Sequence, residues 1–159
     1  MTTRQAAKSV PDGFELPLMH LLRRASQAAD ALCQKPLRNA GMTPRQWVVL
    51  AAIAAGEGAN QTDLENRTGI DRSTIADIMR RLHKAGLVRR HRSRKDARAY
   101  VVSLSTEGRR AYEAGKVIAA SVDEAIMQRL PANGHRELLD ALQALIQPVD
   151  QQETLTAFR

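Results

Sequence analysis

Apolar residues recur at helical spacing over most of the chain, whereas one short part alternates at strand spacing. The helical stripe is clearest where Ile75, Ile78, Met79 and Leu82 fall at positions i, i+3, i+4 and i+7. Residues at these intervals share one face of a helix, so the pattern predicts an amphipathic helix. In residues 100–104 apolar positions alternate instead, and we expect one face of a strand there to pack on the helices.

A second, shorter helix is predicted immediately before this one. Residues 61–68 form a short helical segment that Asn60 can cap. Gly69 begins a turn in which glycine allows a positive φ, and Asp71 can cap the next helix. Gly86 is placed to end that next helix. Two helices joined by so tight a turn are typical of a helix-turn-helix.

Two strands and a basic turn follow the helix-turn-helix. Residues 87–91 and 100–104 are strand-like, and residues 93–98 would form the tip of the hairpin between them. A β-hairpin in this position is a wing. The pattern therefore predicts a winged helix-turn-helix.

Positive charge is concentrated in this helix and hairpin. Ten of the 24 Lys and Arg residues lie between Arg72 and Arg98, where the acidic residues are Asp77 and Asp96, so this stretch carries +8. The whole chain carries +7, which leaves −1 for everything outside the stretch. Localised charge of this kind indicates a binding surface for a polyanion.

The helix face opposite the apolar stripe has small polar residues early and arginines later. Such a face suits insertion into a major groove, where these side chains reach base edges or phosphates. Asp77 either accepts a hydrogen bond from a cytosine amino group or pairs with Arg80 or Arg81 and orients them. A merely solvated basic face is the alternative, and the neighbouring turn and hairpin favour DNA. The candidate DNA-binding residues are Arg72, Ser73, Thr74, Asp77, Arg80, Arg81 and Lys84 in the helix and Arg94, Lys95, Asp96 and Arg98 in the wing.

Helices before this domain carry apolar stripes of their own. Pro17 stands in the first turn of a long helix with Leu and Ala at helical spacing, and Pro36 should kink or end that helix. Thr43, Pro44 and Gln46 form a capping box with proline at the first helical position. They begin a helix that is apolar on most sides, which we expect to lie beneath the helix-turn-helix.

The helix after the wing is long. Ser105 can cap it, and its apolar pattern continues to Leu130 before Pro131 breaks it. At 1.5 Å per residue its length is about 35 Å. Asn133 can cap a last helix, which Pro148 stops.

The stripes of these outer helices exceed what a small domain can bury alone. A two-fold dimer in which the N- and C-terminal helices interdigitate is the economical arrangement, and a monomer with a helical cap is the alternative. A dimer would present two recognition helices about one turn of DNA apart to a pseudo-palindromic duplex. The predicted fold class is mainly α with a small β-hairpin wing, divided into a flexible arm (1–14), a helical dimerisation region (15–40 and 106–148), a winged helix-turn-helix DNA-binding domain (41–105) and a frayed tail (149–159).

Composition argues against several other functions. One Trp, two Tyr and two Phe are too few for the stacking platforms of an RNA or single-strand binder. A single cysteine rules out an intrachain disulfide, and the four histidines lack zinc-ligand spacing, so no metal or other cofactor is expected. No phosphate-binding glycine loop or catalytic motif is present, and we expect no enzyme. Without a membrane-span-length apolar segment or a secretory signal, we expect a soluble, cytoplasmic protein.

The wing and the segments around it resemble a known family. The helix-turn-helix, the AGLVRR entry into the first strand, the Asp96-x-Arg98 pair and the following LSTEG resemble the MarR family of bacterial transcription regulators, over about residues 16–145. The resemblance implies that Arg98 enters the minor groove while Asp96 fixes its guanidinium. It also implies a dimer, usually a repressor released by a small ligand or by thiol oxidation. Family members more often have Arg or Asn in place of Asp77 and Ala in place of Glu65, and both departures concern which bases are read.

The resemblance further implies a ligand, often an aromatic carboxylate or phenol, bound between the dimerisation helices and the winged domain. His20, Arg24 and Trp47 are the candidate ligand-binding residues, forming a half-apolar cleft that grips a carboxylate. The alternatives are a solvated helix face or a salt bridge for the first two and a core position for Trp47. Thiol oxidation would have to use Cys33, whose alternative is a small, half-buried side chain. A constitutive architectural DNA binder is a third hypothesis.

Overall fold

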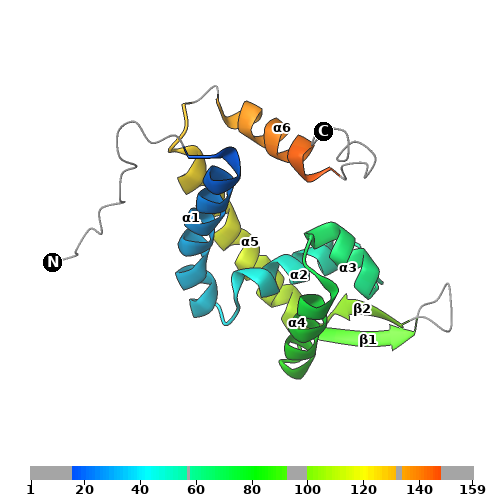
Figure 1. Cartoon of the computed structure of the whole chain (residues 1–159). Coiled ribbons are helices and arrows are strands. Elements are labelled where there is room, and N and C mark those ends of the chain that lie inside the picture. Colours follow the sequence, from blue (N-terminus) through cyan, green and yellow to red (C-terminus); the bar gives the residue numbers. More distant parts are fainter. Residues whose placement is uncertain (1–15, 57, 93–99, 132–133, 148–159) are drawn as a thin grey trace, which may run out of the picture.

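The structure is a computed structural model that describes residues 16–56, 58–92, 100–131 and 134–147. Two long helices, α1 and α5, pack against each other, and a winged helix-turn-helix lies at one end of the pair (Figure 1). The last helix, α6, lies at the opposite end. In chain order the elements are α1 (Leu18–Asn39), α2 (Pro44–Ala54), α3 (Gln61–Thr68), α4 (Arg72–Lys84), β1 (Val88–Arg92), β2 (Tyr100–Leu104), α5 (Thr106–Met127) and α6 (Gly134–Ile146).

Four helices begin at the N-cap residues that the sequence predicts. The side chains of Thr43, Asn60, Asp71 and Ser105 each accept a hydrogen bond from a backbone N–H in the first turn of the following helix. The first two caps are reciprocal, because the Gln46 and Asp63 side chains accept in turn from the cap backbone. These caps confirm the starts of α2 through α5.

Two details at helix ends differ from the sequence predictions. Pro36 lies inside the last turn of α1, which continues to Asn39. The long helix α5 ends at Met127, earlier than the apolar pattern indicated, because Pro131 has no N–H to donate to the Met127 carbonyl and its ring would clash with that carbonyl in a continued helix. A ring nitrogen of His135 lies 2.8 Å from the Met127 carbonyl oxygen and provides that helix end with a hydrogen bond. The predicted cap at position 133 lies outside the described residues.

The core lies where α2 passes beneath the helix-turn-helix. Val49, Leu50 and Ile53 from α2 are buried with Leu64 from α3 and Ile75 from α4. The predicted central position of α2 is therefore confirmed. The apolar stripe of α4 faces this core, and Ile78 and Leu82 complete its buried side. Burying each large aliphatic side chain contributes about 1.5–3 kcal/mol, so this stripe fixes the rotation of α4 about its own axis.

One face of the hairpin packs on the helices, as expected, and the opposite face is partly covered as well. β1 and β2 are antiparallel, with Arg90 opposite Val102. The Val102 N–H also donates to the Ala59 carbonyl over 2.9 Å, so the segment after α2 pairs with the second edge of β2. Val101, on the other face, is buried beside Gly58. The extra pairing brings this segment against the strand and covers the face that the alternation assigned to solvent.

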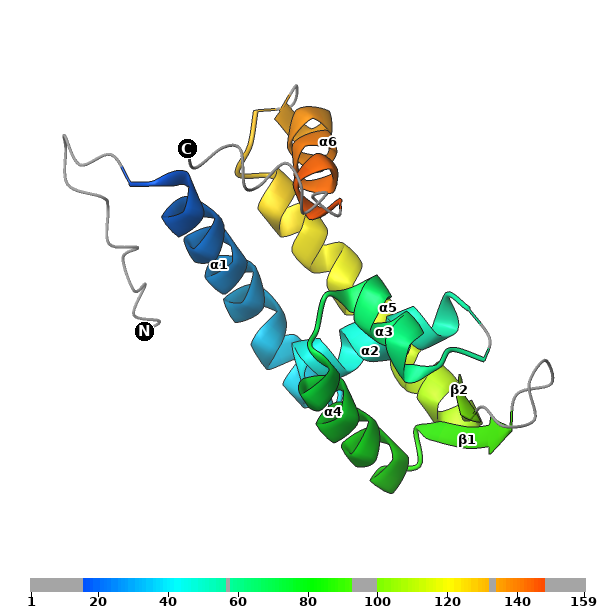
Figure 2. The ribbon, with the colours of Figure 1, turned by 45° about the vertical axis from the view of Figure 1, so that its right-hand side comes forward.

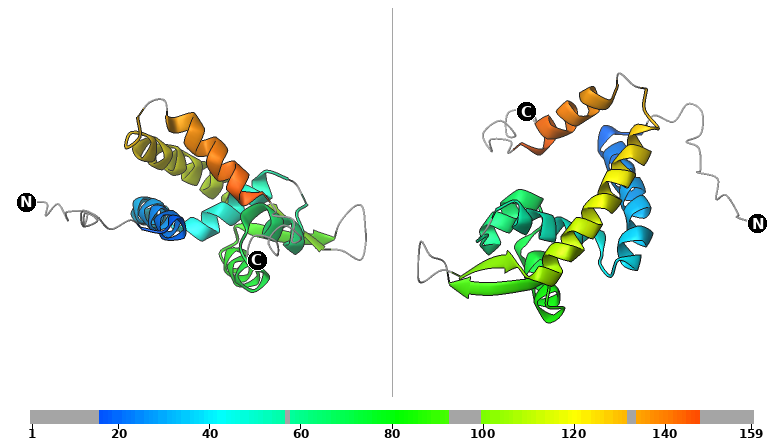
Figure 3. Two further views of the ribbon diagram at one scale, coloured as in Figure 1. Left: turned by 45° about the horizontal axis from the view of Figure 1, so that its top comes forward. Right: turned by 180° about the vertical axis from the view of Figure 1, so that it is seen from behind.

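The outer helices leave large apolar side chains in contact with water. At the start of α1, Leu18 and Met19 are 66% and 80% exposed. In α6 no residue is buried, and Leu145 and Ile146 are 55% and 80% exposed. Figure 3 shows α6 crossing beyond the end of the α1–α5 pair, away from the core. The prediction that a single chain does not cover these stripes is confirmed.

Candidate nucleic-acid interface

The helix α4 is held between two well-defined ends with one face turned outward. Gly69 ends α3 in the left-handed region, with φ of 65°, and Asp71 caps α4 two residues later. The opposite end carries His83 and Lys84, which suit the negative end of the helix dipole. Since Ile75 and its apolar neighbours are buried, the polar face of α4 points to solvent at the same end of the molecule as the hairpin (Figure 2).

Asp71 is the N-cap residue of this helix. Its carboxylate accepts from the Ser73 hydroxyl over 2.5 Å and from the Thr74 backbone N–H over 2.9 Å. These hydrogen bonds, with that from Ser73 the largest effect, lower the pKa of Asp71 well below its ordinary range. The sequence proposed Ser73 and Thr74 for DNA contact, and in this structure both are part of the N-terminal cap.

The lowered pKa predicts how the stability of α4 depends on pH. A carboxyl group with a depressed folded-state pKa stabilises the fold above its unfolded pKa of about 3.9, and this contribution is lost as the pH falls toward the folded-state value. The variant Asp71→Asn keeps a capping oxygen but does not titrate. We expect it to be less stable than the wild type at neutral pH, with the gap closing as the solution is acidified below about pH 4. Urea midpoints at several pH values measure the gap, and a constant gap would contradict the assignment.

Asp77 lies in the middle of the outward face and joins two arginines. Its Oδ1 atom accepts a hydrogen bond from Arg80 Nη2, and its Oδ2 atom forms an ion pair with Arg81 Nε, 2.8 Å away. The two guanidinium side chains are 77% and 68% exposed. The sequence predicted pairing with one arginine or the other, and the structure confirms pairing with both. Arg72 and Lys84 complete the exposed cationic side chains of α4.

A second set of cations lies along the hairpin, and the sequence analysis did not single it out. The Arg90 guanidinium carbon lies 4.2 Å from the centre of the Tyr100 ring, and that of Arg92 lies 5.4 Å away. Tyr100 lies opposite Arg92 in the strand pairing and diagonal to Arg90, so both are within reach of its ring. The sequence could have predicted this set, because Arg90 and Arg92 are alternate residues of β1 and alternate residues of a strand share one face.

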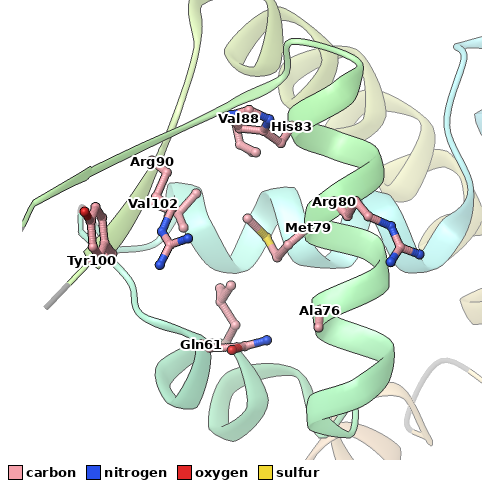
Figure 4. Close-up of a pocket in the computed structure, with 10 residues that line it drawn as sticks. Gln61, Ala76, Met79, Arg80, His83, Val88, Arg90, Tyr100 and Val102 are labelled. Carbon is pink, nitrogen blue, oxygen red and sulfur yellow. The ribbon is translucent and has the colours of Figure 1, made fainter.

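A groove of about 430 Å³ separates α4 from this hairpin. Its walls come from α3, α4 and both strands, and Figure 4 shows Arg90 and Tyr100 on one side facing Met79 on the other. The Arg80 side chain extends from α4 away from the other labelled residues of the groove. Although Arg80 borders the groove, its side chain therefore remains on the outward face of α4.

The candidate DNA-binding residues divide into two groups. Those of α4 are brought together on one solvent-exposed end, although Ser73 and Thr74 also belong to the helix cap. The wing candidates Arg94, Lys95, Asp96 and Arg98 lie outside the described residues.

The three candidate ligand-binding residues occupy different surroundings. His20 and Arg24 are exposed on α1. Trp47 is half-buried in the first turn of α2, where its indole N–H lies 3.4 Å from the Tyr112 carbonyl oxygen and its ring contacts Gly115. Within the described part of the chain, no hydrogen bond or ion pair joins one of these three residues to another. Trp47 packs against the core, as its alternative interpretation predicted.

Cys33 is half-buried near the end of α1. Burial raises the pKa of its thiol, and the negative charges of Asp30 and Asp123 raise it further. Because the thiolate is the form that oxidants attack, a raised pKa makes Cys33 less reactive. The thiol-oxidation hypothesis is not favoured.

Comparison with known proteins gives the same answer as the geometry. A model of the MarR family matches residues 40–99, which include α2, the helix-turn-helix and β1. The transcriptional regulator HosA of Escherichia coli O127:H6 is 34% identical over 113 residues, covering 71% of this chain and 82% of HosA. The chain belongs to the MarR family. It is accordingly a DNA-binding transcription regulator, and its mostly helical fold with a two-stranded hairpin matches MarR-family structures.

Two solved structures resemble most of this chain. BpsR of Bordetella bronchiseptica, whose DNA binding is regulated by 6-hydroxynicotinic acid, is 26% identical with a TM-score of 0.74, covering 81% of this chain and 98% of BpsR. The repressor CouR of Rhodococcus jostii RHA1, bound to a 23-mer DNA duplex, is 25% identical with a TM-score of 0.74, covering 84% of this chain and all of CouR. Within the described ranges, no helix of this MarR-family chain is long and apolar enough to cross a membrane.

Proposed function

We propose that this MarR-family protein is a homodimeric repressor that binds a pseudo-palindromic duplex site and is released by a small aromatic acid. The observation that carries the proposal is the outward face of α4, where exposed arginines stand opposite the buried side chains of Ile75, Ile78 and Leu82. Such a helix enters a major groove without disturbing the core. The duplex bound to CouR, a repressor of the same architecture, supports this mode of binding.

In this proposal the residues of the interface have different tasks. Arg72 and Arg80 contact bases or phosphates from α4, and Lys84 contacts the phosphate backbone. Arg98 of the wing enters the neighbouring minor groove, with Asp96 orienting its guanidinium. Arg94 and Lys95 supply further phosphate contacts.

The proposed dimer is supported by the exposed apolar side chains of α1 and α6. Two chains that cover these stripes against each other would place two α4 helices on one face of the duplex, about one helical turn apart. In a two-fold dimer the same surface patch of each subunit forms the interface, so the same residues of both chains would cover each other.

The ligand part of the proposal follows from the chemistry of α1. Arg24 is exposed and cationic, with His20 one helical turn earlier, so a carboxylate bound there would find a charged partner beside apolar surface. Trp47 would close the inner side of the cleft. BpsR, which responds to an aromatic carboxylic acid, supports this class of effector.

A competition gel shift tests the proposal. Purified protein is mixed with the intergenic duplex upstream of its own coding region, with random duplex as competitor, at near-physiological salt and with or without a panel of aromatic carboxylates. We expect a shifted complex that random duplex does not remove and that one of the acids releases. Binding that random duplex abolishes would contradict a sequence-specific repressor of this site.

The wing makes a separate prediction. We expect Arg98→Ala to lower the affinity for the selected duplex by about 10-fold with a modest decrease in the salt slope, because one cation leaves the duplex. Arg72→Ala should also change the base preference. Arg129→Ala, an exposed arginine after the end of α5, is the matched control and should leave affinity unchanged. Unchanged affinity for Arg98→Ala at fixed salt would contradict the wing assignment.

A further inference from the structure

The ion pairs of Asp77 leave the two arginines of α4 with different sets of free donors. A guanidinium group has five N–H donors, and its two terminal nitrogens form the fork that matches O6 and N7 of guanine. Arg81 is bound to Asp77 through Nε, over 2.8 Å, so its two terminal nitrogens have no partner among the residues that the structure describes. Arg80 is bound through the terminal nitrogen Nη2, so part of its fork is already engaged.

The fold does not need these ion pairs. Exposed ion pairs contribute little to folding stability, because water and salt screen them. The rotation of α4 is already set by its buried stripe, and its start is already set by the Asp71 cap. The consequence of the Asp77 pairs is therefore to restrict two long, mostly exposed side chains that would otherwise sample many rotamers.

We propose that Asp77 is a positioning residue that orients Arg81 to read a guanine in each half-site, leaving Arg80 to contact phosphate. This inference rests on the proposed DNA-binding function. Both carboxylate oxygens of Asp77 are paired with arginines, so Asp77 acts through Arg81 and does not read cytosine itself. Pre-orienting the guanidinium lowers the entropy lost when it binds a base edge, which raises discrimination for guanine at that position.

The experiment is a double-mutant cycle on base preference. Site selection with the full-length wild-type protein defines the preferred duplex and the G·C pair in each half-site on which binding depends most. Gel shifts then compare that duplex with one carrying A·T at the same pair, for the wild type, Asp77→Ala, Arg81→Ala and the double variant. Asp77→Asn, which keeps the shape of the side chain, repeats the test without changing its volume.

The G·C preference is the ratio of the affinities for the G·C and A·T duplexes. If Asp77 acts through Arg81, this ratio falls by about 10-fold in each single variant and by no more than that in the double variant. Asp77→Ala should also bind random duplex at least as tightly as the wild type, because it removes a negative charge from the surface. Asp140→Ala is the matched control, since it removes the carboxylate of another exposed Asp–Arg pair, with Arg136 on α6, and should keep the full preference.

Three outcomes would overturn the inference. Losses that add in the double variant would mean that Asp77 reads the base pair directly. A wild-type preference retained by Asp77→Ala and Asp77→Asn would mean that Arg81 needs no positioning. A wild-type protein that does not distinguish the selected duplex from random DNA would overturn the proposed function itself, and the first two outcomes leave that function intact.

Discussion

Replacing Leu142 and Ile146 on α6 with glutamate is expected to convert the protein to a monomer and to lower its affinity for the selected duplex by about 100-fold or more. These side chains are 38% and 80% exposed in the single chain, so the substitutions remove no core contact. Glutamate is also a good helix former. In a dimer the same positions would place four charges in an apolar interface, where desolvation opposes association.

The large effect expected on DNA binding follows from the two α4 helices that the proposed dimer would present to one duplex. In the proposed dimer, binding of one α4 helix would hold the second near its half-site at high effective concentration, and a monomer would lose this advantage. Sedimentation velocity measures the mass, and a gel shift measures the affinity. Gln143→Glu, an exposed polar position on the same helix, is the control and should remain dimeric. A double variant that stays dimeric would show that α6 is outside the interface.

Gly108→Ala should destabilise the fold by about 3 kcal/mol, the upper part of the range for overpacked positions. A Cβ atom at this position would lie 1.8 Å from the Leu87 carbonyl oxygen. That carbonyl cannot move freely, because it accepts from the Ser105 N–H over 3.0 Å. The Ser105 hydroxyl in turn donates to the Gly86 carbonyl over 2.6 Å and accepts from the Gly108 N–H over 2.9 Å. The clash therefore has to separate the start of α5 from the start of β1.

This result would be opposite in sign to the one expected from helix propensity, which favours alanine over glycine by about 1 kcal/mol. Urea unfolding at fixed protein concentration measures the change. Gly134→Ala at the start of α6 is the matched control, since its nearest contact would be the Pro131 ring at an ordinary 3.5 Å. It should be neutral or slightly stabilising, by up to about 1 kcal/mol. Equal stability of the two variants would contradict the tight junction between hairpin and helix.

Local patterns were sufficient for much of the winged helix-turn-helix. A capping side chain acts on backbone groups two or three residues away, so Asn60 and Asp71 could be assigned from sequence spacing alone. The stripe from Ile75 to Leu82 determined which face of α4 is buried, and therefore which face is available to DNA. The pairing of Asp77 was also within reach, because residues three and four apart are neighbours on a helix.

Contacts between distant segments were out of reach of these patterns. Nothing near Ala59 in the sequence indicates that it pairs with Val102, because the partner is chosen when α2 and the hairpin pack together. The crowding of Gly115 against Trp47 is similar, since the two residues meet only when α5 packs on α2. The surroundings of the candidate ligand residues were also out of reach, because packing places Trp47 against the core and leaves Arg24 exposed on α1.

By itself, the sequence determined where the helices and strands lie, which face of each is apolar, and where positive charge gathers, because these properties depend on residues within one or two turns of each other. Only the tertiary structure decided that the hairpin is covered on both faces, that Trp47 packs against Gly115, and that α1 and α6 keep apolar surface exposed. Each of these depends on the directions of side chains and on distances between segments far apart in the chain, which are set when the elements pack.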